Sequence, residues 1–541
     1  MEVDLFLAGA IGALILLFYY YVAKKYEYFQ STSIPCVKPT FLLGSSGPTM
    51  FRTKDVTAHM NSLYYTYPES KMIGFFDLMS PMFMVRDPDI IKRISIKDFD
   101  HFVDHTPSMS NAATDEEIGG ESLFGNSVFA LRGQKWRDMR ATLSPAFTGS
   151  KMRHMFELVA ECSKSAIEFL TAEAKSGKRL EYEMKDIFSR FCNDVIASVA
   201  FGVKIDSLRE PENVFYQKGK HLLTDGQSLW LVIKVFLIKI VPKLSEKLNV
   251  EFVNADLAKY FKKMIEDNME QRKSGGIVRN DMIQLLMEVQ KGTLQHQKED
   301  QESNDASFAA VHEPNVGKST HSRVWTENEL IAQCFVFFFA GFDTVSTCMA
   351  FLTYELTINP DIQNRLYAEI LQTEQSLNGA SLTYETLQKM EYLDMVVSET
   401  LRKWPPAVVT ERFCTKDYHY DDGAGTRFDI KKEQTVLIPT ISIQNDAKYF
   451  PDPERFDPER FSRENRAKIN TGAYIPFGVG PRNCIGLRLA LMEVKMIVYY
   501  LLKDFGLEPT EKTQIPLRIA KNLFSLEAEK GIWVELKNRD A

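Results

Sequence analysis

The hydrophobic pattern begins with an apolar stretch close to the N-terminus. Residues 5–23 (LFLAGAIGALILLFYYYVA) contain no charged side chain and would form a helix about 28 Å long, close to the roughly 30 Å hydrocarbon core of a bilayer. Lys24 and Lys25 follow the stretch, which favours a cytoplasmic position for the rest of the chain. The flanks do not match a cleaved signal peptide. We therefore predict a membrane anchor, residues 1–30, with one span at 5–23.

Two later stretches depart from the globular pattern. Residues 229–244 (LWLVIKVFLIKIVPKL) are the next most apolar, but three lysines and a proline interrupt them. They suit either a buried amphipathic helix or a surface helix that dips into the same membrane with its lysines reaching the headgroups. Residues 291–322 are polar and lack apolar periodicity, so we predict a linker. This linker lies inside a single predicted catalytic domain, residues 31–541.

Helical periodicity dominates the remainder, with short strands such as 82–85 and 436–438. Thr326 and Glu329 form a capping-box pattern that opens an apolar run reaching Thr357. That run predicts a single helix of about 32 residues, near 48 Å. A helix this apolar along its middle must be buried on all sides. The predicted fold class is mainly α with small β-sheets (α+β).

Composition narrows the function classes. The chain has 541 residues, a formal net charge of −7, 45% apolar and 25% charged residues, which excludes a basic nucleic-acid-binding protein, a disordered chain and a polytopic transporter. Its seven cysteines are scattered and include no CxxC pair. This spacing argues against a disulfide framework or a structural zinc site, and it indicates a reducing compartment.

The most specific chemical signal is residues 477–486 (FGVGPRNCIG), followed by a helical pattern over 487–502. The glycines allow a tight loop and the close approach of a flat ligand. Cys484 would lie just before a helix N-terminus, which favours a thiolate. Together with Arg482, this arrangement suits an axial haem ligand whose propionate pairs with the guanidinium. One cysteine taken alone would be interpreted as a small core residue, but the ten-residue pattern favours the haem ligand.

A second signal is AGFDT, residues 340–344, in the middle of the long apolar helix. Glycine, aspartate and threonine are unfavourable in a buried helix interior. One interpretation is a helix kink at which Thr344 bonds back to its own turn. The other is a local opening where Asp343 and Thr344 move protons.

These motifs resemble those of the cytochrome P-450 family, the haem-thiolate monooxygenases. The family fingerprint FxxGxRxCxG is matched at Phe477, Gly480, Arg482, Cys484 and Gly486. The family's (A/G)Gx(D/E)T motif is matched at 340–344, WxxxR at 136–140, ExxR at 399–402 and PERF at 458–461. The resemblance covers essentially the chain after residue 30 and implies the cytochrome P-450 fold with one N-terminal transmembrane helix.

The resemblance implies a haem b cofactor (iron protoporphyrin IX) with Cys484 as the iron ligand. The residues that it implies in haem binding are Cys484, Arg482, Trp136, Arg140, Arg412, Phe477 and Gly478. It further implies that Asp343 and Thr344 are the catalytic proton-delivering pair, and that Glu399, Arg402 and Arg460 form a buried structural triad. The substrate pocket would draw on Val128, Phe129, Val336, Phe339, Ala340, Val408, Val409 and Leu523 or Phe524, although ordinary core packing explains each of these individually.

The implied activity is insertion of one oxygen atom from O2 into lipophilic substrates. Details resemble the microsomal branch that includes vertebrate drug-metabolising enzymes, and most of all an insect detoxification member acting on xenobiotics such as plant toxins or insecticides. The family relation implies a position in the endoplasmic reticulum membrane and electrons from NADPH through a separate cytochrome P-450 reductase, with cytochrome b5 left open as a further partner. Arg132, Lys135 and Arg137 would either meet that acidic reductase or form a solvated basic face.

Three alternatives stay open at this point. The same chemistry could act on an endogenous lipid or hormone, the protein could be a haem-thiolate isomerase, or it could be a non-catalytic lipophile-binding haem protein. The intact Asp343 and Thr344 argue against the last two. Gln444 and Ala447 stand where many relatives have His and Pro, a departure that concerns local stability and not the iron site.

Overall fold

The computed structural model describes residues 2–106, 122–224, 229–240, 253–279, 281–290, 308, 324–522 and 525–539. The predicted linker 291–322, apart from Phe308, and the pocket candidates Leu523 and Phe524 lie outside the described residues. The helices are α1 (Glu2–Tyr26), α2 (Gly47–Met50), α3 (Val56–Tyr64), α4 (Pro88–Lys92), α5 (Gly133–Leu143), α6 (Gly149–Lys175), α7 (Met184–Phe201), α8 (Val214–Thr224), α9 (Leu229–Ile240), α11 (Ala255–Gly275), α12 (Met282–Gln290), α13 (Glu327–Ile358), α14 (Pro360–Leu377), α15 (Tyr384–Gln388), α16 (Glu391–Lys403), α17 (Thr440–Gln444) and α18 (Leu487–Asp504).

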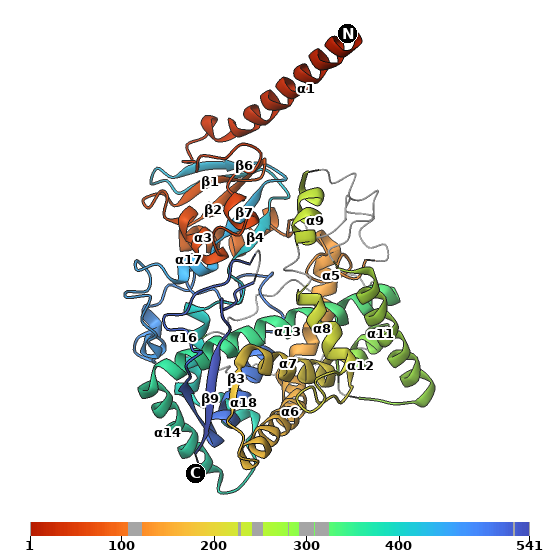
Figure 1. Ribbon diagram of the computed structural model, residues 1–541, viewed down its shortest axis with the longest axis vertical. Helices are drawn as coiled ribbons and strands as arrows, with labels where there is room; N and C mark the ends of the chain where they lie inside the picture. Colours follow the sequence, from red (N-terminus) through yellow and green to blue (C-terminus); the bar gives the residue numbers. More distant parts are fainter. Residues whose placement is uncertain are drawn as a thin grey trace.

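The long central helix forms as its caps predict. The Thr326 hydroxyl accepts the Glu329 N–H at 3.3 Å, and a Glu329 carboxylate oxygen accepts the Thr326 N–H at 2.9 Å, which completes the capping box. α13 then runs for 32 residues through the middle of the body (Figure 1). α7 packs against it, and a Cβ on Gly341 would lie 2.6 Å from Ile196 of α7. The glycine therefore permits this close approach.

Three small sheets complete the fold. The strands are β1 (Met72–Asp77), β2 (Ser80–Val85), β3 (Glu181–Glu183), β4 (Thr410–Phe413), β5 (Tyr418–Asp421), β6 (Arg427–Ile430), β7 (Thr435–Ile438), β8 (Phe505–Pro509) and β9 (Trp533–Asn538). They pair in the orders β1-β2-β7-β4, β3-β9-β8 and β5-β6. In the first sheet β7 runs parallel to β2 and antiparallel to β4, with Phe83 opposite Val436 and Val436 opposite Arg412. The mainly helical fold with small sheets is confirmed.

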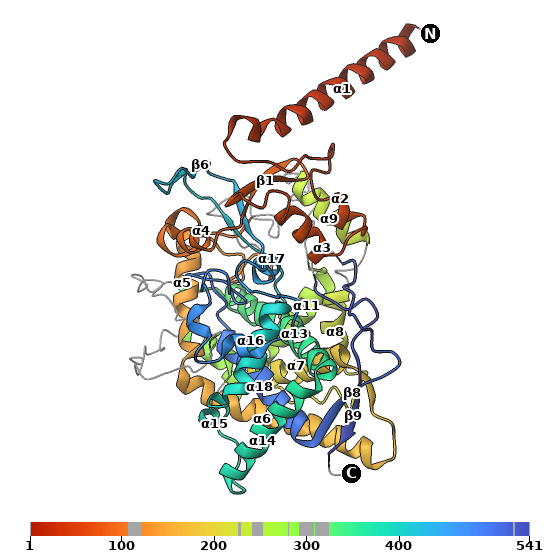
Figure 2. The same cartoon turned by 90° about the vertical axis from the view of Figure 1, so that its left-hand side faces the viewer.

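The N-terminal helix α1 projects away from the body at the end that carries the first sheet (Figures 1 and 2). Its apolar side chains, among them Phe6, Leu14 and Leu17, are exposed, whereas Val22 near its end is buried. Among the described residues, α13 is the helix that has the length and apolar composition to cross a membrane, and most of it is buried inside the body. A membrane span by α1 stays a prediction.

Helix α9 covers the described part of the apolar stretch 229–244 and lies at the same end of the body as α1 (Figure 2). Ile238 is buried and Ile233 is 40% exposed. Lys239 forms an ion pair with Asp77 of β1, so this lysine points to protein and not to solvent. The described part of α9 is therefore partly buried, which lies between the buried helix and the membrane-dipping helix that the sequence allows. Contact of α9 with a membrane stays a prediction.

Candidate active site

The loop around Cys484 is closed by its own backbone. The Cys484 N–H donates to the Phe477 carbonyl at 2.8 Å. Gly478 and Gly480 have φ values of +73° and +79°, which side chains rarely adopt. A Cβ on Gly480 would also overlap the Ser95 carbonyl oxygen. The glycines therefore set the path of the loop that presents Cys484, as the sequence predicts.

Cys484 differs from the other cysteines in its accessibility. All seven are free thiols, and only Cys484 is exposed, although protein atoms surround it closely enough to raise its pKa. The Gly486 N–H and the Arg140 guanidinium oppose that rise in pKa. The N-terminus of α18 thus favours the thiolate as expected, but desolvation outweighs it. A metal cation bound to the sulfur would keep the Cys484 side chain deprotonated.

The two basic residues beside the loop have different surroundings. Arg140 of α5 donates to the Asn483 carbonyl at 2.9 Å and to its side-chain oxygen at 2.8 Å, so it fixes the residue before Cys484. Arg482 donates to backbone carbonyls from residues 103 to 131, the shortest of these bonds being 2.7 Å to Val103 and to Leu131. Its guanidinium also lies 4.0 Å from the centre of the buried Trp136 ring. Pairing of Arg482 with a haem propionate stays a prediction, because these acceptors already surround it.

Arg412 provides a test of whether an anionic group fits here. Its side chain is fully buried, and its Nε has no hydrogen-bond partner among the described residues. Burial lowers the pKa of Arg412 to about 10, which leaves it cationic at neutral pH. A buried cation with an unsatisfied donor requires an anionic acceptor. The accessible thiol, the glycine loop and the unpartnered donor of Arg412 together fit a haem, for which Cys484 would supply the iron ligand and Arg412 a partner for an anionic group.

The predicted triad is brought together. Glu399 and Arg402 are fully buried and joined by bonds of 2.7 and 2.9 Å, and Arg460 Nε lies 3.4 Å from a Glu399 oxygen. Burial raises the pKa of Glu399, and the two arginines oppose that rise. Arg402 also donates to the carbonyls of Gln444 and Pro453. The triad thereby ties α16 to the segment that leads to the Cys484 loop.

Gln444, one of the departures from the family pattern, takes part in the same support. Its side-chain nitrogen donates to the Leu401 and Arg402 carbonyls at 2.9 and 3.0 Å. Its oxygen accepts the Ile475 N–H at 2.8 Å, two residues before Phe477. This fully buried amide therefore links the end of α16 directly to the start of the Cys484 loop.

The middle of α13 opens on one side. Ala340 and Thr344, one turn apart, are exposed, although most of the neighbouring residues on α13 are buried. The Thr344 hydroxyl donates to the Ala340 carbonyl at 2.8 Å, the bond that the kink interpretation expects, yet the helix continues without interruption. The structure therefore shows both features that the sequence suggested. Thr344 bonds back to its own helical turn, and the helix is locally exposed at Ala340 and Thr344.

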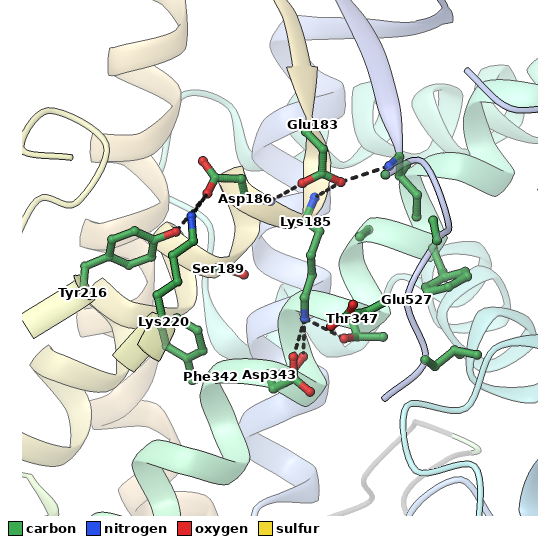
Figure 3. Close-up of a pocket in the computed structure, with 16 residues that line it drawn as sticks. Glu183, Lys185, Asp186, Ser189, Tyr216, Lys220, Phe342, Asp343, Thr347 and Glu527 are labelled. Atoms are coloured by element: carbon green, nitrogen blue, oxygen red, sulfur yellow. Dashed lines mark hydrogen bonds and ion pairs between the residues drawn. The ribbon is translucent and has the colours of Figure 1, made fainter. Parts of the chain in front are cut away.

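Asp343, the residue before Thr344, has different surroundings, and its side chain meets that of Lys185 (Figure 3). Lys185, at the start of α7, donates to the Asp343 carboxylate at 2.7 Å and to Ser346 and Thr347 at 2.8 and 2.6 Å. Asp343 and Lys185 line a cavity of about 270 Å³ whose wall also includes Glu527. Burial and the Asp343 charge raise the pKa of Glu527. Asp343 is therefore held by a cation at a cavity lined with titratable groups.

The pocket candidates vary in accessibility. Val128, Val336 and Val408 are buried, Phe339 and Val409 are half-buried, and Phe129 is 37% exposed. The structure connects Phe129 to Phe339 through Phe124, with ring-centre distances of 5.8 and 6.3 Å. It thus brings the α13 and loop candidates into one aromatic cluster.

The basic face expected on α5 is largely neutralised. Lys135 pairs with Glu329 at 2.7 Å and Arg137 with Asp100 at 2.6 Å. Less positive charge is therefore free to attract an acidic partner than the sequence alone suggests.

Three residues with clear roles in these contacts were not identified from sequence. Lys185 holds Asp343, Asn483 receives Arg140, and Gln333 of α13 binds the loop that carries Val128. Gln333 has a recognisable signal, because it is an amide inside an otherwise apolar run. Lys185 and Asn483 have no such signal in the sequence, because each forms its hydrogen bond with a residue more than 100 positions away.

Comparison with known proteins agrees with this geometry. The family model described as Cytochrome P450 matches residues 35–534. The chain is 41% identical over 524 residues to "Probable cytochrome P450 9f2" of Drosophila melanogaster, covering 97% of each chain. It is 40% identical to "Cytochrome P450 9e2" of Blattella germanica (98% of this chain, 97% of the relative) and 33% identical to "Cytochrome P450 3A41" of Mus musculus (98% and 96%). With its accessible Cys484 in a glycine loop, its buried Glu399–Arg402 pair and these matches along its length, the chain belongs to the cytochrome P450 family of haem monooxygenases.

Proposed function

We propose that the protein is a membrane-anchored haem-thiolate monooxygenase that inserts one oxygen atom from O2 into lipophilic xenobiotics, such as plant toxins or insecticides. Electrons come from NADPH through a separate reductase, and the enzyme sits in the endoplasmic reticulum membrane with its body in the cytoplasm. The similarity to insect and mammalian cytochromes P450 supports the assignment to a branch of the family that acts on xenobiotics.

The observation that carries the catalytic assignment is the environment of the 340–344 motif. Thr344 is exposed on one side of a helix that is mostly buried, and the adjacent Asp343 carboxylate reaches a cavity of about 270 Å³. An isomerase or a simple binder needs no such pair, whereas oxygen activation consumes protons. The haem supplies the oxygen chemistry when it is bound.

The side chains of this protein have three roles in that chemistry. Cys484 is the thiolate ligand, and the backbone bond to Phe477 and the contact of Arg140 with Asn483 hold it in place. Asp343 takes protons from the cavity, and the Lys185 ammonium keeps its carboxylate in position between transfers. Thr344 passes the proton on from its hydroxyl, which the Ala340 carbonyl orients.

Lipophilic substrates follow from the apolar lining. Val336, Phe339 and Ala340 lie on the face of α13 near Thr344, and Phe129 exposes part of its ring. Val128 and Val408 complete an apolar set without a charged side chain among the candidates. Such walls exclude water and accept apolar ligands of many shapes.

The test is turnover in a reconstituted membrane. The full chain would be expressed with a cytochrome P-450 reductase and given NADPH and a panel of lipophilic compounds, with NADPH consumption and oxygenated products measured. We expect product to form in proportion to NADPH. The variant Cys484→Ala should lose both the turnover and the reduced carbon monoxide band typical of haem-thiolate proteins.

A surviving carbon monoxide band in Cys484→Ala would contradict the ligand assignment. Cys414→Ala is the matched control, because Cys414 is a buried thiol outside the loop; it should keep the band. Product formed without NADPH would instead favour the isomerase.

A further inference from the structure

A line of aromatic rings joins the 128–129 loop to the opening in α13. His105 and Phe129 stack, with ring centres 4.5 Å apart and planes inclined by 17°. Phe129 contacts Phe124 at 5.8 Å, and Phe124 meets Phe339 edge-on at 6.3 Å. Phe339 directly precedes the exposed Ala340. The rings therefore form one wall that ends at the accessible side of α13.

The main chain of Phe129 is held from two directions. Arg482 donates to the Val128 and Phe129 carbonyls at 3.2 and 3.3 Å. The Gln333 side chain accepts the Val128 N–H at 2.7 Å. Because these bonds hold the backbone, the remaining freedom of Phe129 is rotation of its side chain. The His105 ring covers one of the two faces of the Phe129 ring.

His105 is itself fixed by the partly buried Glu411. Its Nδ1 lies 3.0 Å from a Glu411 oxygen, and the other Glu411 oxygen accepts the N–H and the hydroxyl of Thr106 at 3.0 and 2.8 Å. Burial lowers the pKa of His105, with Arg482 and Arg412 acting in the same direction and Glu411 opposing them. Contacts with His105, hydrogen bonds from Thr106 and the Arg412 charge lower the pKa of Glu411 to about 2 against the effect of burial. The geometry suits a neutral imidazole that donates from Nδ1 to a carboxylate.

We propose that His105 is a positioning residue that sets substrate preference. It holds the Phe129 ring as a fixed flat wall of the substrate pocket, so that the enzyme selects lipophiles carrying an aromatic ring over saturated lipophiles of the same size. The proposal rests on the monooxygenase function proposed above. A ring that is already immobile loses little further freedom when a ligand stacks on it, and stacked aromatic pairs attract beyond their buried area.

A matched ligand pair isolates this effect. 2-Ethoxynaphthalene and its saturated counterpart 2-ethoxydecalin share a carbon skeleton and differ in aromaticity. Their dissociation constants for the holoenzyme would be measured by equilibrium dialysis, and the ratio of the two constants compared between variants. This ratio cancels general changes in affinity.

Three substitutions at His105 separate the ring from its hydrogen bond. His105→Ala should reduce the preference for the aromatic ligand about two- to tenfold, the range expected for one stacked pair. His105→Asn keeps a donor for Glu411 without a ring and should lose the preference to the same extent. His105→Phe keeps the ring and should retain it.

His419→Ala is the matched control, because His419 forms a similar pair with Asp429 at 2.8 Å on the surface; its ratio should equal that of the parent. If the His105 variants fail to retain haem, Phe129→Leu removes the stacking face directly and should give the same loss. An unchanged ratio in a haem-retaining His105→Ala or His105→Asn variant, or in Phe129→Leu, would overturn the proposal.

The outcomes also separate this proposal from the proposed function. Absence of the carbon monoxide band in the parent, or of product from both compounds, would refute the monooxygenase assignment. If both compounds give product but the ratio of dissociation constants is the same in the parent, His105→Ala and His105→Asn, the role of His105 alone is refuted.

Discussion

Thr344 and Asp343 are adjacent in the chain, yet they meet different surroundings. Thr344 is exposed on the open side of α13 and bonds to the Ala340 carbonyl, whereas Asp343 bonds to Lys185 and faces a cavity. Successive residues of a helix are separated by about 100° around its axis, so one motif can reach both regions. The proton transfer proposed for this pair would therefore run from one side of the helix to the other.

Removal of the Thr344 hydroxyl should uncouple the reaction. In Thr344→Ala the Ala340 carbonyl keeps its place in the helix, so we expect haem content to stay at the parent level. Proton delivery is impaired, and a larger share of NADPH oxidation should yield hydrogen peroxide. The ratio of product to NADPH, measured together with peroxide, checks this.

Thr357→Ala is the control for that experiment. Thr357 makes the same type of bond, to the Thr353 carbonyl at 2.7 Å, at the far end of α13. It should leave coupling unchanged. Equal coupling in Thr344→Ala and in the parent would contradict proton transfer through Thr344.

Residue types and short spacings predicted the candidate site, but not the partners of its members. Cys484, Asp343 and Thr344 could be named because their motifs are local in sequence. Lys185 could not, since its partner Asp343 is 158 residues away. Arg482 was expected to face a propionate, and its carbonyl partners at residues 103–131 depend on long-range packing that no local pattern encodes.

The ends of the helices were easier to predict from the sequence than the burial of their side chains. The capping box of Thr326 and the glycine before α18 fixed two helix starts through backbone bonds within a few residues. Burial of α13 followed from its apolar composition, and a local opening was one of the two interpretations of the motif at 340–344, where Ala340 and Thr344 are exposed. The half-buried position of α9 likewise depends on the ion pair of Lys239 with Asp77, which joins two distant segments.

The contact between α18 and α7 contains a titratable group with a consequence for stability. Glu493 of α18 is buried, and one of its oxygens has no hydrogen-bond partner among the described residues. Burial raises its pKa to about 8, while Cys192 of α7 partly opposes the rise. The protonated acid is thus favoured in the folded state, so the contribution of Glu493 to stability is fully present below its unfolded pKa of about 4.3 and is lost as pH rises toward 8.

Glu493→Gln should remove this pH dependence. The neutral amide has a similar shape, so we expect the variant to match the parent near pH 5 and to exceed its stability at pH 8.5 by on the order of 2–4 kcal/mol. Denaturant unfolding of the holoenzyme across this range checks the prediction. The surface variant Glu511→Gln should follow the parent, and parallel curves for Glu493→Gln and parent would contradict the prediction.

For the molecule as a whole, α1 and the first sheet define one end. The Tyr26 hydroxyl donates to the Leu78 carbonyl at 3.1 Å, and its ring lies 4.9 Å from that of Phe76. Phe6, Leu14 and Leu17 of α1 are exposed, and this part of the helix projects from the body (Figure 2). The last turn of α1 thus belongs to the body, and the projecting part is available to a bilayer.

Deletion of residues 2–21 should release the protein from membranes and preserve its carbon monoxide band, because Val22 and Tyr26 remain to complete the packing. Sedimentation of membrane fractions after expression gives the measurement. A full-length chain with Leu14→Lys and Leu17→Lys should also leave the membrane fraction. A truncated protein that still sediments with membranes would show a second contact surface, for which α9 is the first candidate.

The contacts of Arg482 have a consequence for how the chain assembles. Its guanidinium is surrounded by carbonyls contributed about 350 to 380 residues earlier in the chain. The Arg482 segment and the segments that supply these carbonyls reach their final positions only together, a slow step for contacts so far apart in sequence. Pigment content per polypeptide is therefore a gauge of complete folding, and destabilising substitutions near residues 103–131 should deplete colour as severely as substitutions beside Cys484 itself.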